Sequence, residues 1–360
     1  MDSLTVALGK RSYPIVLGDM EEWLPVLAAK IAGRSSLLVT DENVAGSGHA
    51  EKVMRLLQTF PEVKVQLLEL PAGEEHKSLF TVEKIVRAAV AAGLDRQGVM
   101  IALSGGVAGD MTGFAAAVYM RGIEFIQLPT TLLAAVDSSV GGKTGADLPE
   151  GKNLVGAFHQ PILVAMDVKT LKTLPECEWR NGLAEVVKYG MIMDESFLTV
   201  LENNTDKLNS FDPEFYTAVI LRCCQCKAEV VAGDECEKGR RAILNYGHTV
   251  GHAVEKLSDF SLPHGRAVAI GMAAAAHLAV QMNMCSPDVE ARQNALLRSL
   301  KLPERLPVGS NVAKIIEAMH SDKKNSNSQI TMVLPTAAGA VEIVRNIDEN
   351  MLAAALKDLL

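Results

Sequence analysis

The pattern of apolar and polar positions changes about halfway along the chain. In the first half, short apolar runs alternate with segments of helical periodicity. The run Val99–Leu103 is apolar at every position, which is typical of a central parallel strand covered on both faces. The strands predicted in this way are Thr5–Leu8, Tyr13–Leu17, Ser36–Thr40, Val65–Leu70, Val99–Leu103, Phe125–Leu128 and Ile162–Ala165. The predicted helices between them are Glu21–Ile31, Val44–Thr59 and Leu79–Ala92, so the pattern indicates a doubly wound, Rossmann-like α/β domain.

After about Thr170, long helical segments dominate. They are predicted at Glu176–Tyr189, Pro213–Ala232, Thr249–Leu257, His264–Met282, Val289–Leu300, Val312–His320 and Glu349–Leu359. One hairpin is predicted, pairing Gln329–Leu334 with Ala340–Val344. We therefore place a boundary near Asp167–Leu174. We expect an α/β domain at residues 1–170 and a mostly α-helical domain at residues 171–360.

Composition narrows the class of protein. Apolar residues make up 48% of the chain and charged residues 22%, which is ample for two cores. The net charge of −8 disfavours nucleic acid or an anionic membrane as a partner. The N-terminus has no basic region and no long apolar run, and the six cysteines do not form a disulfide framework. We therefore expect a cytoplasmic protein with reduced thiols and no signal peptide.

Three histidines lie close together in the second half. His248 and His252 are four residues apart in a predicted helix, so both imidazoles project from one face. His264 follows, just before another apolar helix. This pattern is typical of a zinc site, although ordinary buried histidines remain the alternative. Glycines beside the histidines indicate that backbone and ligands approach closely.

A glycine-rich turn follows the strand Val99–Leu103. The residues Ser104-Gly105-Gly106-Val107-Ala108-Gly109-Asp110 join that strand to a helical run, which is how α/β folds hold a pyrophosphate. The spacing differs from Gly-x-Gly-x-x-Gly, so a tight turn that needs small residues remains the alternative. Asp41 ends an earlier strand, where its carboxylate would either accept from a ribose hydroxyl or cap a helix.

Two lysines and a glutamate complete the candidate chemistry. Lys143 ends a run that resembles a Walker A loop, but Asp137 stands where that loop needs glycine, which excludes a nucleotide triphosphatase. Lys143 and Lys152 on glycine-rich loops suit phosphate or carboxylate binding, with solvated surface lysines as the alternative. Glu185 and Lys188 form either a surface ion pair or, beside the histidines, part of a site in which Glu185 is the third metal ligand.

Six segments resemble the 3-dehydroquinate synthase family, in the same order along the chain. They are Ser104–Ala115, Leu128–Gly145, Gly151–Pro161, Leu183–Gly190, Asn245–Ala253 and His264–Met272. The resemblance implies a cytosolic, homodimeric lyase of the shikimate pathway and aromatic amino acid biosynthesis. Such an enzyme converts 3-deoxy-D-arabino-heptulosonate 7-phosphate to 3-dehydroquinate and phosphate. The route is transient oxidation by NAD, phosphate elimination, re-reduction and intramolecular aldol closure.

The resemblance also implies roles for residues. Zinc, with Co²⁺ as a substitute, would be held by Glu185, His248 and His264. NAD would be bound at Asp41, Gly105, Gly106, Val107, Asp110, Thr130 and Thr131, with Lys143 and Lys152 close by. The substrate would contact Arg121, Asp137, Lys143, Lys152, Asn153, Lys188, Lys227, Arg241, Asn245, His252 and Lys324. His252 is thus implied to contact the substrate, whereas its spacing from His248 alone predicts a ligand.

Three other classes of protein remain for comparison. An NAD- and metal-dependent polyol dehydrogenase, to which the family is similar in fold, would not need the predicted anion-binding residues Lys143, Lys152, Asn153 and Arg241. Another sugar-phosphate cyclase is closer in chemistry. A non-enzymatic binding relative would be expected to lose metal ligands, and none is lost. Two positions depart from the family pattern, with Ser104 in place of a common glycine and Arg266 in place of a common glutamate.

Overall fold

The chain folds into two compact units. The computed structural model describes residues 1–258, 261–320 and 329–360. Unit 1 comprises Met1–Leu174 and Cys223–Cys236, and unit 2 comprises Pro175–Arg222 and Glu237–Leu360. The segment Cys223–Cys236, which the sequence pattern assigned to the second domain, therefore packs with the first.

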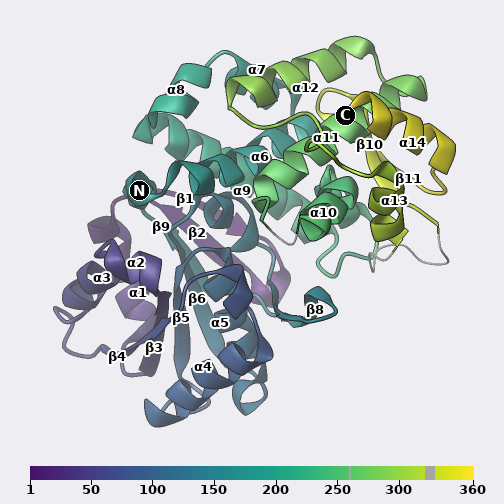
Figure 1. Cartoon of the computed structure of the whole chain (residues 1–360). Helices are drawn as coiled ribbons and strands as arrows, with labels where there is room; N and C mark the ends of the chain where they lie inside the picture. The colour runs from purple at the N-terminus through teal and green to yellow at the C-terminus, as the bar shows by residue number, and fades with distance from the viewer. Residues whose placement is uncertain (259–260, 321–328) are drawn as a thin grey trace. The chain divides into compact units, whose positions relative to one another are not determined.

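A seven-stranded sheet is the centre of unit 1. Its strands lie in the order β1-β2-β9-β6-β5-β3-β4, and only the edge pair β1–β2 is antiparallel. The strands are β1 (Asp2–Val6), β2 (Tyr13–Leu17), β3 (Ser35–Asp41), β4 (Lys64–Leu70), β5 (Val99–Ser104), β6 (Glu124–Pro129) and β9 (Leu163–Met166). Figure 1 shows helices on both faces of this sheet, which confirms the predicted doubly wound α/β fold.

The strand order reverses beside β3. The chain passes from β3 to β4 on one side and then returns to place β5 on the other side of β3. In open α/β sheets, ligands bind outside the carboxyl ends of the strands at such a switch point. The ends of β3 and β5 carry Asp41 and the glycine turn that starts at Gly105.

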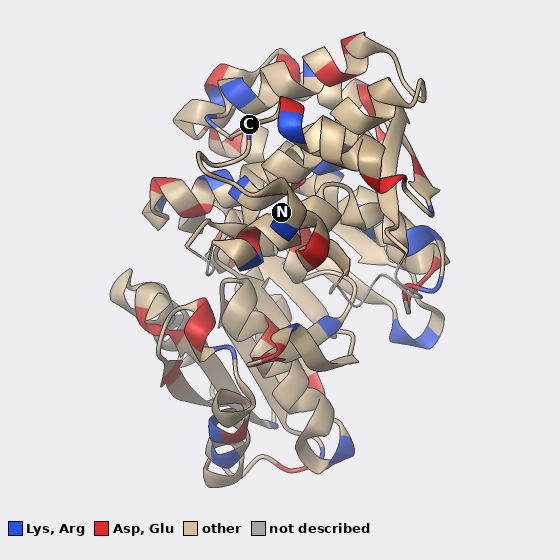
Figure 2. Cartoon of the chain, turned by 45° about the vertical axis from the view of Figure 1, so that its right-hand side comes forward, with Lys and Arg blue, Asp and Glu red and all other residues tan. Residues whose placement is uncertain are grey.

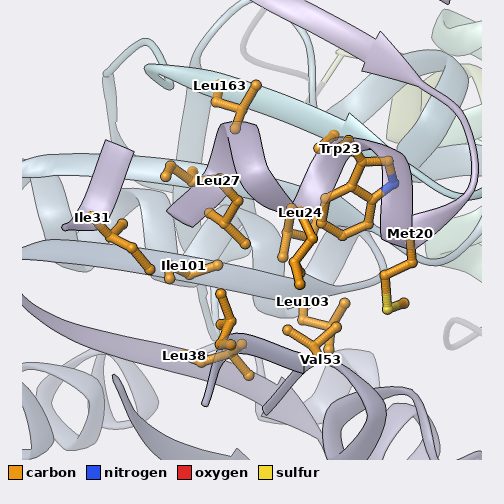
Figure 3. Close-up of a cluster of buried hydrophobic side chains, with 14 of the residues drawn as sticks. Met20, Trp23, Leu24, Leu27, Ile31, Leu38, Val53, Ile101, Leu103 and Leu163 are labelled. Carbon is orange, nitrogen blue, oxygen red and sulfur yellow. The ribbon is translucent and has the colours of Figure 1, made fainter. Parts of the chain in front are cut away.

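Each face of the sheet has its own core. The helices α1 (Met20–Ile31) and α3 (His49–Leu57) cover one face, where Leu27 points towards Ile101 (Figure 3). The helices α4 (Leu79–Ala91) and α5 (Gly106–Val118) cover the other, against the alternate strand residues such as Leu37 and Met100. This alternation fixes the register, because a one-residue slip would turn every side chain to the wrong face.

A hairpin outside the main sheet was not predicted. Residues assigned to glycine-rich loops instead form β7 (Lys143–Leu148) and β8 (Gly151–Phe158), paired antiparallel. The strands approach so closely that a Cβ at Gly156 would lie 2.1 Å from the carbonyl oxygen of Thr144. The loop prediction was wrong because glycine, which this contact requires, is a poor signal for a strand.

Two other boundaries differ from the prediction. The first strand begins at Asp2, because β1 pairs with β2 in the register Asp2↔Leu17 to Val6↔Tyr13. The single helix predicted between residues 44 and 59 is two helices, α2 (Glu42–Gly46) and α3. Gly48 breaks them with a φ of +79°, a conformation that favours glycine.

Unit 2 is mostly helical. Its helices are α6 (Glu176–Met193), α7 (Glu195–Glu202), α8 (Thr205–Ser210), the first half of α9 (Pro213–Gly233), α10 (His248–Leu257), α11 (His264–Gln281), α12 (Pro287–Ser299), α13 (Val312–His320) and α14 (Glu349–Asp358). The sequence pattern missed α7 and α8 and placed the hairpin β10 (Met332–Ala337) and β11 (Ala340–Val344) within a few residues. Acidic and basic positions are interspersed along these helices (Figure 2).

Among the described residues, no helix combines the length and apolar character needed to span a membrane.

Candidate active site

Glycines bring three helices of unit 2 into close contact. A Cβ at Gly271 of α11 would lie 1.8 Å from the carbonyl oxygen of Gly247, the residue before α10. A Cβ at Gly265 would lie 2.3 Å from the carbonyl oxygen of Asn181 in α6, and the Gly265 N–H donates to Asn181 Oδ1 at 3.0 Å. The start of α10 therefore lies directly against the middle of α11, and the start of α11 lies directly against α6.

This packing brings Glu185, His248 and His264 together. Their ligand atoms all lie within 4.8 Å of one another. The Nε2 atoms of His248 and His264 are 3.5 and 3.7 Å from Glu185 Oε1. Two ligands of a tetrahedral zinc ion are about 3.4 Å apart, given bonds near 2.1 Å. Both imidazole nitrogens therefore already lie within a few tenths of an ångström of the separation from Glu185 Oε1 that a shared ion requires.

The second nitrogen of each imidazole is already engaged. Nδ1 of His248 donates to the carbonyl oxygen of Tyr246 at 3.0 Å, since a carbonyl can only accept. Nδ1 of His264 lies 3.1 Å from Oε2 of Glu255. A neutral imidazole with its proton on Nδ1 offers the lone pair of Nε2. The donor set, two imidazole nitrogens and one carboxylate, fits a catalytic zinc or cobalt ion with an open coordination position.

The pKa values of the two histidines shift in opposite directions. Burial lowers the pKa of His248 well below the ordinary value, which keeps that imidazole neutral. Burial alone would also lower the pKa of His264, but the hydrogen bonds with Glu185 and Glu255 outweigh it and raise the pKa to about 9. His264 would therefore release a proton when a metal binds, as metal ligands in proteins commonly do.

Glu185 is buried in an apolar helix together with Lys188. Both side chains are 1% exposed and form an ion pair three residues apart on α6. Removing one partner of such a pair leaves a buried charge without compensation, which typically costs about 3–5 kcal/mol. Lys188 thus lies beside the candidate metal ligands, where it holds the free oxygen of Glu185.

His252 lies near the three candidate ligands and is outside their group. Its ring centroid is 5.3 Å from that of His248 and 5.9 Å from that of His264. Arg241 and Asn245 precede α10 on a short helical segment, Arg240–Asn245, where Arg241 is buried and Asn245 Nδ2 donates to Glu237 Oε1 at 3.0 Å. Lys324, the remaining residue predicted for this half of the chain, lies outside the described residues.

In unit 1, the glycine turn starts α5 at the switch point of the sheet. Gly105 is the N-cap of α5, and Gly106 and Val107 are its first residues. Cβ atoms at Gly105 and Gly106 would lie 3.0 Å from the side chains of Thr131 and Ser138. The turn therefore presents bare backbone beside Thr131, with the buried Thr130 at the end of the adjacent strand β6. Such a helix N-terminus suits a phosphate.

The acidic residues near this turn have partners in the structure. Asp41 Oδ1 accepts from the N–H groups of Asn43 and Val44 at 3.1 Å, so Asp41 is a helix cap whatever else it binds. Asp110 Oδ2 lies 2.7 Å from Nζ of Lys77. Burial alone would lower the pKa of Lys77, but the carboxylates of Asp110 and Glu74 raise it.

Sequence analysis missed Lys77. It lies at the end of the charged run Glu74-Glu75-His76, next to Ser78, the N-cap of α4. A lysine directly before a helix N-cap was the signal available in the sequence, but the charged run is typical of a solvated turn. Its contact with Asp110 places Lys77 beside the start of α5.

The predicted substrate residues of unit 1 form two groups. On the β7–β8 hairpin, Lys152 Nζ is 3.0 Å from Glu74 Oε1. The next residue, Asn153, has a φ of +52° and donates its N–H to Asp147 Oδ1 at 2.7 Å. Lys143 begins β7 with an exposed side chain. Acidic residues therefore hold two members of this group, because Glu74 contacts Lys152 and Asp147 accepts from the Asn153 backbone.

The second group links Asp137 and Lys227, which are ninety residues apart in sequence. Nζ of Lys227 lies 3.0 Å from Asp137 Oδ1 and donates to the Asp137 carbonyl oxygen at 2.7 Å. Lys227 is buried and comes from Cys223–Cys236, the returning segment of unit 1. This contact gives that segment a defined place in the unit.

Arg121 does not join either group. It lies between the end of α5 and the start of β6, with a φ of +70°, and its side chain is exposed. Arg121 is therefore at the end of the sheet where the parallel strands begin. The glycine turn and Thr130 are at the opposite end, where the strands β5 and β6 finish. Arg121 instead borders a groove of about 750 Å³ with Arg34, Arg96 and His159.

Comparisons with known proteins agree along the whole chain. Residues 67–181 match the family model described as 3-dehydroquinate synthase N-terminal, and residues 182–325 match 3-dehydroquinate synthase C-terminal. The chain is 46% identical over 359 residues to the 3-dehydroquinate synthase of Desulforamulus reducens, covering 99% of both proteins. It is 47% identical over 335 residues to that of Halorhodospira halophila, covering 93% of both.

Solved structures give a consistent result. A 2-deoxy-scyllo-inosose synthase in complex with carbaglucose-6-phosphate, NAD⁺ and Co²⁺ matches 100% of both chains with a TM-score of 0.91 and 26% identity. The 2-epi-5-epi-valiolone synthase of Streptomyces hygroscopicus, with NAD⁺ and Zn²⁺, matches 98% of both with a TM-score of 0.89 and 29% identity. An iron-containing alcohol dehydrogenase shares the fold alone, at a TM-score of 0.68 and 15% identity over 96% of both chains.

Proposed function

Because the chain belongs to the 3-dehydroquinate synthase family, we propose that it converts 3-deoxy-D-arabino-heptulosonate 7-phosphate to 3-dehydroquinate and phosphate. The reaction class would be carbon–oxygen lyase, with NAD and a divalent metal as cofactors. The observation that carries the proposal is the group Glu185, His248 and His264, which has the donor set and the fixed tautomers of a catalytic metal site.

We propose that each unit supplies part of the chemistry. Glu185, His248 and His264 of unit 2 would hold Zn²⁺ or Co²⁺, and the turn at Gly105 and Gly106 of unit 1 would receive the pyrophosphate of NAD. When bound, NAD supplies a hydride acceptor and the metal supplies a Lewis acid. Two related structures contain NAD⁺ together with Co²⁺ or Zn²⁺, which supports both assignments.

The other residues would bind and orient the substrate. Lys152 and Lys143 are cations on a hairpin whose shape is fixed by backbone contacts, so they suit a phosphate ester or carboxylate. Lys227 is held by Asp137, which pre-organises its ammonium group. His252 lies beside the ligand histidines without an assigned metal role, and its imidazole suits proton transfer near neutral pH.

Two rival functions fit less well. Another sugar-phosphate cyclase is the nearer one. Two solved structures of that kind share 26–29% identity with this chain, against 46–47% for the two 3-dehydroquinate synthases compared above. A polyol dehydrogenase shares only the fold, and its neutral substrates would not require Lys152 or Lys143.

NAD is expected to be required but not consumed. Loss of phosphate accounts for all atoms and electrons of the conversion, so no net oxidation takes place. With purified enzyme, zinc, NAD and excess substrate, phosphate release should be continuous while absorbance at 340 nm from reduced cofactor does not accumulate. Omission of NAD should abolish phosphate release. Reduced cofactor that accumulates in proportion to product would contradict the proposal and favour the dehydrogenase.

We further propose that the enzyme is a homodimer in which Arg121 serves the site of the second copy. Arg121 is exposed at the end of the sheet opposite to Gly105 and Thr130, so a substrate role for it requires another chain.

All six cysteines lie in the described part of the chain and none forms a disulfide, which is in keeping with action in the reducing cytoplasm.

This arrangement predicts complementation between two inactive variants. Arg121→Ala and His248→Ala chains should each be inactive as homodimers. A mixed dimer should regain activity, because one of its two sites then has both a native His248 and a native Arg121. The measurement is phosphate release by mixed dimers purified through two different tags. If mixed dimers stay as inactive as their parents, Arg121 either acts within its own chain or has no role.

A further inference from the structure

One buried carboxylate beside the candidate metal ligands has no assigned role. Glu255 is 4% exposed and comes from α10, two helical turns after His248 on the same face. Its Oε2 atom lies 3.1 Å from Nδ1 of His264. Burying a carboxylate is unfavourable unless it is paired, so its position against an imidazole nitrogen calls for an explanation.

We propose that Glu255 is the positioning residue that fixes the tautomer and ring orientation of His264 for metal binding. This inference rests on the metal site of the proposed function and adds a residue to it. A carboxylate on Nδ1 holds the proton there and directs the Nε2 lone pair towards Glu185 Oε1, 3.7 Å away. His248 is oriented in the same manner by the Tyr246 carbonyl, so both imidazoles have a fixed outer partner.

The sequence explains how Glu255 comes to lie there. His248, His252 and Glu255 occur at intervals of four and three residues and thus share one face of α10. Gly251 on this helix approaches the start of α11, where a Cβ would lie 3.0 Å from the carbonyl oxygen of Ala267. The close packing of α10 on α11 brings the first residue of α11, His264, within reach of a short glutamate side chain.

An alternative metal site that includes Glu255 as a ligand can be distinguished from the proposed one. His252, Glu255 and His264 also have ligand atoms within 4.8 Å of one another, so Glu255 would instead be a direct ligand if an ion bound there through Nδ1 of His264. The two arrangements are exclusive at Nδ1, because this nitrogen either carries a proton for Glu255 or binds a metal. One ion per chain is expected in the proposed arrangement, and a second ion in the other.

The chain offers a matched control. On the same helix α11, Nδ1 of His277 lies 2.9 Å from Oε1 of Glu290, in α12. This is also a carboxylate–imidazole contact, but His277 is thirteen residues from His264 and is not part of either candidate metal group. Glu290→Gln therefore measures what the loss of such a contact does to unit 2 without an effect on the metal ligands.

The test compares zinc affinity in the wild type, Glu255→Ala, Glu255→Gln and Glu290→Gln. Affinity is measured by chelator competition without NAD or substrate, and folding of the metal-free proteins is checked by circular dichroism. Glu255→Ala should weaken zinc binding about 10- to 100-fold. Glu255→Gln should fall between Glu255→Ala and the wild type, because its amide oxygen accepts the Nδ1 proton more weakly than a carboxylate. Glu290→Gln should bind as the wild type does.

A spectroscopic readout separates positioning from general structure. In the zinc form labelled with ¹⁵N-histidine, the Nδ1 proton of His264 should be protected from exchange in the wild type and in Glu290→Gln, and exposed in Glu255→Ala. Wild-type zinc affinity in Glu255→Ala would overturn the proposal, as would a second zinc ion per chain that His252→Ala removes. If Glu255→Ala does not fold, wild-type affinity in Glu255→Gln overturns it. A wild type that binds no zinc would overturn the metal site as well.

Discussion

Replacing His248 or His264 by alanine is expected to remove the metal and the activity together. In the proposed site each imidazole supplies one of three protein ligands, and Nε2 of each lies within 3.7 Å of Glu185 Oε1. Two remaining ligands bind zinc far more weakly than three, so metal content should fall from about one ion per chain to near zero after dialysis. The measurements are elemental analysis and phosphate release on the same preparations, with circular dichroism to confirm folding.

His252→Ala is the matched variant for this experiment. Its ring lies 5.3 Å from that of His248, on the same helix, yet the structure gives it no place among Glu185, His248 and His264. The variant should lose activity and keep about one zinc ion per chain, the number that a single catalytic site holds. If His252→Ala loses its metal as His248→Ala does, the four-residue spacing was the better guide and the ligand assignment is wrong.

Gly271→Ala should destabilise unit 2 and impair metal binding, although the change adds a single methyl group. A Cβ at this position would lie 1.8 Å from the carbonyl oxygen of Gly247 and 2.8 Å from the N atom of Gly251. Both neighbours are backbone atoms, so no rotamer change relieves the overlap and α10 must move away from α11. We expect a loss of about 3 kcal/mol or more in the free energy of unfolding, at the upper end of overpacking effects.

The control for this change is Gly233→Ala. At the end of α9, a Cβ on Gly233 would have no atom within 4 Å, so alanine should be neutral or stabilise by up to about 1 kcal/mol. Denaturant unfolding and zinc affinity are measured for both variants. Helix propensity alone predicts that Gly271→Ala is stabilising too. Equal unfolding midpoints for the two variants would therefore show that the contact between α10 and α11 is not rigid.

The sequence predicted the sheet of unit 1 well because its central strand β5 begins with an unbroken apolar run. The run Val99–Leu103 has no polar residue, which is typical of a strand covered on both faces, and the structure buries it on both faces. The β7–β8 hairpin was missed for the opposite reason. Its glycines, such as Gly145 and Gly156, are needed for the close approach of the two strands, and glycine is what a sequence prediction interprets as a loop.

The sequence predicted which types of residue form the candidate site, but it did not predict most of the contacts between them. Histidines beside glycines indicated a metal site, and the structure brings two of the three together with Glu185. Helical spacing alone could not separate His248 from His252, because that distinction depends on how α10 crosses α6 and α11. Glu255 went unnoticed since a glutamate three residues after a histidine resembles an ordinary helix surface, and only the packing shows it to be buried.

The discontinuity of unit 1 affects the order in which the protein matures on the ribosome. Lys227 pairs with Asp137, yet 89 residues of chain separate them and residues 175–222 belong to unit 2. The N-terminal unit therefore cannot complete its contacts until Cys236 has left the exit tunnel, when part of the helical unit has already been synthesised. A fragment ending at Leu174 would lack Lys227, the partner of Asp137, and Cys224, which donates to the Ala135 carbonyl oxygen. No single cut therefore separates the two units, because a split near residue 174 leaves unit 1 unfinished and a split after residue 236 removes α6 from unit 2.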